Sequence, residues 1–175
     1  QPVGKLMLAV LSNAVIARAE KRLGVTLDYS RHIARTSFGL FLRYGKIFDL
    51  IDPRRHVPAD AYATARLRGA LAADCGTCIR AEISQARSGG LSDALIGEVL
   101  LGDIENLPAR LQVVRRLADA ICRDRMDDPD ARAEIVNLYG DAGLIELSYA
   151  MNGAAMMPGI KRAMGYATAC DASVF

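Results

Sequence analysis

Apolar residues recur at helical spacing along almost the whole chain, and polar or breaking residues separate the periodic segments. Gly24 ends the first segment, Ser92 and Asp128 are helix caps, and Pro108 opens a further helix. The pattern predicts helices over 4–23, 30–50, 58–73, 77–86, a segment capped by Ser92, a segment opened by Pro108, 128–139, 144–157 and 160–164.

Several breaks are predicted inside this pattern. Gly39 and Gly45 weaken the segment 30–50, so that it can divide there. Pro158 and Gly159 are expected to separate the last two helices, since proline cannot donate a helical hydrogen bond. The tail after Tyr166 is expected to be loose.

Composition supports one helical fold class. Hydrophobic residues make up 51% of the 175 residues, whereas aromatic residues make up 6%, and the β-branched runs typical of strands are scarce. The length suits one domain with a sizeable core. We therefore expect an all-α protein, a compact bundle of seven or eight helices forming a single domain over 1–175.

Charge and hydropathy exclude some partners. The chain has 22 basic and 20 acidic residues, and no basic run with interleaved aromatics, so a nucleic-acid groove is not expected. The apolar run 6–11 is too short and too interrupted for a membrane span. No signal-peptide cleavage pattern follows it, so a cytoplasmic protein is expected, although Gln1 leaves the true N-terminus open.

Two of the four cysteines lie three residues apart where a helix is predicted to start. Cys75 and Cys78 flank Gly76, which removes side-chain bulk between them. Backbone N–H groups at a helix start favour thiolate over thiol and so lower the pKa of a cysteine. Such a pair can cycle between dithiol and disulfide.

Three other interpretations of the pair stay open at this point. The cysteines can be small buried apolar residues. A zinc site would need two more ligands, and His32 and His56 lie upstream without ligand spacing. A thioredoxin-like site would need strands alternating with helices, which the pattern does not predict. No metal or prosthetic group is therefore expected.

A helical chain with Cys-x-x-Cys at a bend between helices resembles the alkylhydroperoxidase D and carboxymuconolactone decarboxylase superfamily. The likeness is carried by residues 59–102, including DCGTC and GGLSDALIGEVLLGD, and by LIELSYAMNGAAMMPGIKRAMGY further on. The first 55 residues match more loosely. The resemblance implies the alkylhydroperoxidase D-like fold, helical assembly into homo-oligomers, and a peroxide-reactive Cys78 with Cys75 as its resolving partner.

The same resemblance implies a proton relay from a glutamate twelve residues before the first cysteine and a histidine four after the second. Ala63 and Glu82 occupy these positions. Glu82 lies one turn after Cys78, so it is a candidate proton acceptor that replaces the relay. Arg66 and Arg68 precede the cysteines; either could stabilise a thiolate, but a surface role is expected.

The leading hypothesis is a thiol-dependent oxidoreductase that reduces a peroxide or a protein disulfide, with catalytic residues Cys75, Cys78 and Glu82. A family member without peroxidase activity, acting in small-molecule binding or assembly, is the alternative, and decarboxylase or lactone chemistry ranks below both. An external reductant is expected as a partner. Cys122 is expected to be buried on an apolar face, and Cys170 lies in the predicted tail.

Overall fold

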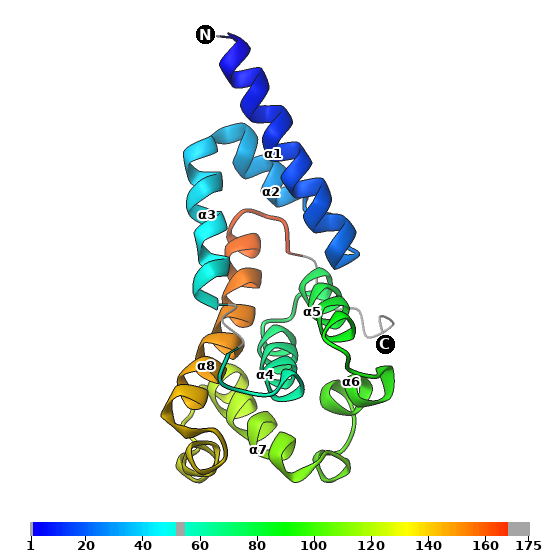
Figure 1. Cartoon of the computed structure of the whole chain (residues 1–175), viewed down its shortest axis with the longest axis vertical. Coiled ribbons are helices and arrows are strands. Elements are labelled where there is room, and N and C mark those ends of the chain that lie inside the picture. The colour runs from blue at the N-terminus through cyan, green and yellow to red at the C-terminus, as the bar shows by residue number, and fades with distance from the viewer. Residues whose placement is uncertain (1, 52–54, 168–175) are drawn as a thin grey trace.

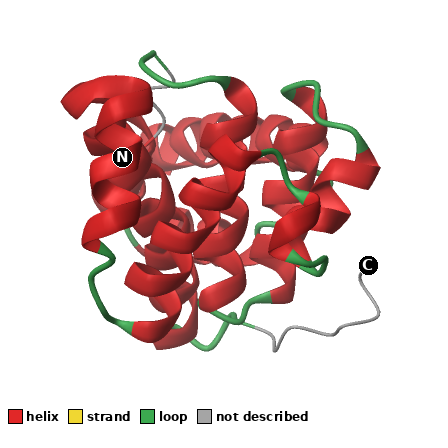
Figure 2. Cartoon of the chain, turned by 90° about the horizontal axis from the view of Figure 1, so that it is seen from below, coloured by secondary structure: helices red, strands yellow, loops and turns green. Residues whose placement is uncertain are grey.

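A computed structural model describes residues 2–51 and 55–167 of the chain (Figure 1). The described residues form helices and loops without a strand, which confirms the predicted all-helical class (Figure 2). The helices are α1 Pro2–Leu23, α2 Asp28–Thr36, α3 Phe38–Ile51, α4 Ala59–Ala72, α5 Gly76–Ser88, α6 Asp93–Leu100, α7 Ala109–Ala118 and α8 Pro129–Ala163, with a 3₁₀ turn at Ile104–Asn106 and a π-helical turn at Asp119–Asp124.

The predicted helix ends are confirmed where a side chain or a glycine makes them. Gly24 follows α1 with φ of +66°, a left-handed conformation that suits glycine. The Ser92 hydroxyl accepts from the N–H of Leu95 at the start of α6. Asp128 accepts from the N–H of Ala131, with a proline in the first turn of α8.

The segment 30–50 divides at a place that the glycines did not indicate. The helix begins at Asp28, and Ser37 interrupts it with extended backbone, φ −158° and ψ 116°. The Ser37 hydroxyl then accepts from the N–H of Leu40, 3.3 Å away, in the first turn of α3. A serine cap inside the predicted helix therefore makes the break, while Gly39 and Gly45 lie within α3.

The predicted separation at Pro158 and Gly159 is wrong. α8 continues through both residues to Ala163, and its non-helical residue is Gly140, with φ of +70°. Pro158 costs the helix one backbone hydrogen bond. It is buried, and Met157 and Lys161 beside it are buried as well, so packing on both sides of the proline offsets that loss.

α4 lies at the centre of the main core, between α5, α7 and α8 (Figure 1). Residues 61–70 of α4 are buried without interruption. The contact with α8 is close, since a Cβ added at Gly69 would lie 2.1 Å from the Met151 carbonyl oxygen. A second apolar cluster joins α1, α2 and α3 to the end of α8: Ile16, Leu27, Tyr29, Ile33, Tyr44 and Met157.

The end of α8 therefore borders both clusters. It passes α4 in the main core and then meets the three N-terminal helices. None of the described helices combines the length and the apolar character that crossing a bilayer requires.

Candidate functional site

The two cysteines lie at the bend between α4 and α5. Asp74 turns the chain with φ of +49°, a left-handed conformation that aspartate adopts more readily than most residues. Cys75 follows as the N-cap residue of α5, and Cys78 lies in the first turn of that helix. Arg162 of α8 donates to the carbonyl oxygens of Ala73 and Asp74, both at 2.9 Å, and so fixes the turn.

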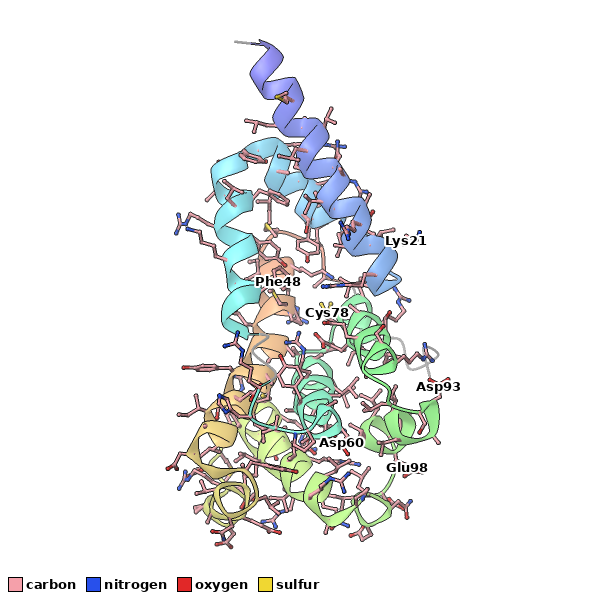
Figure 3. The ribbon with its side chains drawn as sticks, viewed as in Figure 1. Lys21, Phe48, Asp60, Cys78, Asp93 and Glu98 are labelled. Carbon is pink, nitrogen blue, oxygen red and sulfur yellow. The ribbon has the colours of Figure 1, made fainter. Side chains whose placement is uncertain are left out.

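The sulfur atoms of the pair are close neighbours. Cys75 Sγ and Cys78 Sγ are 2.8 Å apart, with a hydrogen bond between them, and both cysteines are free thiols. A disulfide has an S–S distance of about 2.05 Å, so a small movement would join them. Cys75 is 0% exposed, whereas Cys78 is partly exposed. Figure 3 labels Cys78 at the start of α5.

A lysine from the far end of the chain completes the site. Lys161 Nζ lies 3.7 Å from Cys75 Sγ and 3.5 Å from Cys78 Sγ. The residue is 4% exposed, and its ammonium stands 5.1 Å from the centroid of the Tyr29 ring. The face of an aromatic ring attracts a cation, so Tyr29 helps to hold this buried charge against the sulfurs.

These neighbours favour one negative charge on the cysteine pair. The hydrogen bond with Cys78 lowers the pKa of Cys75 to about 5, against the opposing effect of burial, and the Cys78 N–H and Lys161 lower this pKa further. The pKa of Cys78 is raised above its ordinary value by the same hydrogen bond and by burial. The two thiols titrate as a unit: the first proton leaves easily and the second is held.

Two tyrosines adjoin the lysine and the sulfurs. The hydroxyls of Tyr29 and Tyr44 are 2.8 Å apart, and Tyr44 donates to Met157 Sδ at 3.4 Å. Burial raises the pKa of Tyr44, and the neighbouring Tyr29 and Cys78 raise it further. Tyr44 therefore keeps its proton beside the thiolate.

A polar cavity of about 270 Å³ opens beside the lysine. Its lining comes from the start of α2, the first turn of α5 and the end of α8: Thr26, Asp28, Tyr29, Thr77, Lys161, Gly165, Tyr166 and Ala167. Because Lys161 touches both this cavity and the sulfurs, a small molecule in the cavity would lie one side chain away from the thiols.

Glu82, the third candidate residue, binds an arginine. Arg66 donates to both carboxylate oxygens, at 2.7 and 2.6 Å, and both side chains are buried. Ala63 lies beside them in a small cavity of about 30 Å³. The expected surface role of Arg66 is wrong, because α4 is buried on all sides over 61–70. A proton-accepting role for Glu82 stays a prediction.

Arg68 is also buried rather than on the surface. It donates to Asp119 at 2.6 and 2.8 Å and to the carbonyl oxygens of Val99 and Leu100. A buried guanidinium needs such partners, and the π-helical turn after α7 supplies the carboxylate.

Cys122 is buried on its apolar face, as predicted, and burial raises its pKa to about 11. Cys170 lies outside the described residues. The His32 ring lies near the Tyr166 ring, with centroids 5.6 Å apart and a tilt of 43°, and the backbone N–H of His56 donates to Glu146. Within residues 2–51 and 55–167, no three histidine, cysteine or acidic side chains gather as a metal site would need.

The residue that sequence reasoning missed is Lys161. It lies 83 residues after Cys78, so no local spacing connects the two. The nearest signal in the sequence is the apolar segment 144–157, which is predicted as a buried helix and ends four residues before Lys161. A lysine in a buried segment needs a partner, and the sulfurs are that partner here.

Comparison with known proteins gives no match: no family model fits the chain, and neither a curated protein nor a solved structure matches it. The resemblance over 59–102 therefore stays a prediction, carried by the residues themselves.

Proposed function

We propose that this chain is a thiol-dependent oxidoreductase in which Cys75 and Cys78 cycle between dithiol and disulfide. The observation that carries the proposal is the contact of Lys161 with both sulfurs, at 3.7 and 3.5 Å, where the sulfurs are 2.8 Å apart. A buried ammonium beside two thiols stabilises a thiolate, and thiolate is the form that attacks peroxides and disulfides.

The exposure of the two residues supports a division of roles. Cys78 is partly exposed, whereas Cys75 is 0% exposed. Cys78 is therefore the attacking thiol and Cys75 the resolving thiol, in line with the family resemblance. The pair holds one proton when it carries one negative charge, and Cys78 attacks from the form in which that proton has moved across the hydrogen bond to Cys75.

With a hydroperoxide as substrate, the Cys78 thiolate attacks the outer oxygen and the O–O bond breaks. Cys78 becomes a sulfenic acid, and the departing alkoxide takes the proton that Cys75 had accepted, which leaves as part of an alcohol. The Cys75 thiolate then attacks Cys78 Sγ. The S–S bond forms, and hydroxide leaves as water with one proton from solvent.

Two electrons pass from the dithiol to the peroxide in this sequence. An external thiol reductant returns them by attacking the disulfide. With a protein disulfide as substrate, a mixed disulfide on Cys78 replaces the sulfenic acid.

In this mechanism Glu82 is a positioning residue, because its carboxylate is held in an ion pair with Arg66. Glu82→Gln tests the competing role as a proton acceptor: unchanged alkylation kinetics across pH would dismiss the base, whereas a slowed reaction with a shifted pH profile would restore it.

The buried Arg66–Glu82 pair also favours the alternative, a relative of the peroxidases without peroxidase activity that binds a small molecule. The pair fills the region where Ala63 and Glu82 stand in place of the relay that the resemblance implies. In that case the site would bind ligands without turnover of peroxide.

Peroxide consumption with a thiol reductant separates the two functions. We expect turnover by the wild type, loss with Cys78→Ser, and a sulfenic acid trapped on Cys78 with Cys75→Ser. Cys122→Ser is the matched control, since Cys122 is a buried free cysteine in a different segment, the π-helical turn Asp119–Asp124, and it should retain wild-type rates. Equal rates for wild type and Cys78→Ser would eliminate the proposed mechanism.

A further inference from the structure

Residues 7–17 of α1 are apolar on nearly every side and yet mostly uncovered. They read MLAVLSNAVIA and contain no charged side chain. In the single chain, Ser12 and Ile16 are the buried residues of this stretch. A helix that is apolar all round is normally buried, so the chain alone leaves this helix without its expected cover.

The exposed residues form a broad surface that projects from the molecule. Met7, Leu11 and Val15 recur every four residues, and Val10 lies opposite the buried line of Ser12 and Ile16. Met7 is 75% exposed and Leu11 is 56% exposed. In Figure 1 the N-terminal end of α1 extends past the ends of α2 and α3.

We infer that a second copy of this chain covers α1, with the two α1 helices packed antiparallel across a two-fold axis near Leu11. In such an isologous contact, the same patch serves on both copies, so an uncharged apolar surface complements itself. The absence of charge over 7–17 gives a different protein nothing with which to set orientation or specificity. A membrane surface would instead favour a helix with one apolar and one charged face.

The area reaches the minimum for such a dimer when the partner covers all of the exposed apolar side chains of 7–17. The exposed apolar residues of α1 offer roughly 500 Å² per copy, so two copies would bury about 1,000 Å², the lower limit for a specific interface. The inference is independent of the thiol chemistry proposed above.

The test is the mass of the reduced chain in solution, measured by light scattering and by sedimentation over a range of concentrations. We expect twice the 18.9 kDa of the single chain. Leu11→Glu with Val15→Glu should give a monomer with an unchanged helical circular dichroism spectrum, because both residues are exposed in the single chain. Leu101→Glu, at a residue 63% exposed elsewhere on the surface, is the matched control and should remain dimeric.

A charge exchange tests the two-fold arrangement itself. Leu11→Glu and Leu11→Lys should each be monomeric alone and should form a dimer when mixed, because the two substituted residues then face each other. A monomeric wild type, a dimer that persists with both glutamates, or a mixture that stays monomeric would overturn the inference. Binding of monomer to anionic lipid vesicles, with loss of that binding in the glutamate variant, would assign the surface to a membrane instead and overturn it too.

Discussion

Replacing Lys161 with methionine removes the ammonium from beside both sulfurs while keeping an unbranched side chain of similar length. The charge lies 3.5 and 3.7 Å from the two sulfur atoms. At an effective dielectric constant near 20, a full charge pair about 4 Å apart contributes about 4 kcal/mol, which is an upper limit. A hydrogen bond to a charged group contributes about 1.5–3 kcal/mol, which corresponds to about 1–2 units of pKa.

We therefore expect Lys161→Met to raise the first pKa of the cysteine pair by about 1–2 units. Alkylation rate against pH, followed with iodoacetamide, measures that pKa directly. At pH 6, between the lowered pKa of Cys75 and the ordinary value, the rate should fall several-fold. Lys161→Arg should keep part of the effect because it keeps the charge.

Lys21→Met is the matched control, since Lys21 is exposed at the end of α1 and its charge is screened by solvent (Figure 3). It should leave the alkylation profile unchanged. The reasoning is refuted if Lys161→Met and Lys21→Met give the same pH profile as the wild type. A first pKa near the ordinary 8.5 in the wild type would refute it as well.

Three further predictions follow from the same geometry. The pKa of Cys75 is lower in the folded chain than in the unfolded chain, so the reduced protein should gain stability as pH rises from about 5 to about 8.5. Thermal melting of the reduced protein should show this gain, and Cys75→Ser should lack it. A disulfide carries no charge, so oxidation should leave the Lys161 ammonium buried without its counter-charge. Amide hydrogen exchange over 157–167 should then be faster in the oxidised protein than in the reduced protein. In Lys161→Met the oxidised and reduced proteins should exchange at the same rate. Gly69→Ala should lower the free energy of unfolding, measured in urea, by at least about 3 kcal/mol, because the added Cβ would overlap the Met151 carbonyl. Gly97→Ala is the control and should have little effect, because its Cβ would meet nothing within 4 Å.

The helical class and most helix ends could be predicted because they depend on local signals. Ser92 and Asp128 cap helices through hydrogen bonds to residues three positions away, and a sequence pattern records such contacts directly. Ser37 has the same capping chemistry but lies inside an apolar pattern, which concealed it. The break predicted at Pro158 is wrong because burial on both sides of the proline outweighs the backbone hydrogen bond that it removes from the helix.

The part of the site that is close together in the sequence could be predicted, and the part that comes from a distant helix could not. Cys75 and Cys78 lie at a helix start, as their spacing and Gly76 indicate. The cation that favours the thiolate comes from Lys161, and only the packing of α8 brings it there. The burial of Arg66 likewise depends on α4 being enclosed by its neighbours, which no periodicity within α4 reveals.

The most direct test is to add one equivalent of hydrogen peroxide to the reduced chain and map the cysteines by mass spectrometry. The account predicts a peptide link between Cys75 and Cys78, with a loss of two hydrogens, that dithiothreitol reverses while Cys122 stays reduced. Persistence of both thiols, or oxidation of Cys78 to sulfinic acid without any link to Cys75, would contradict it.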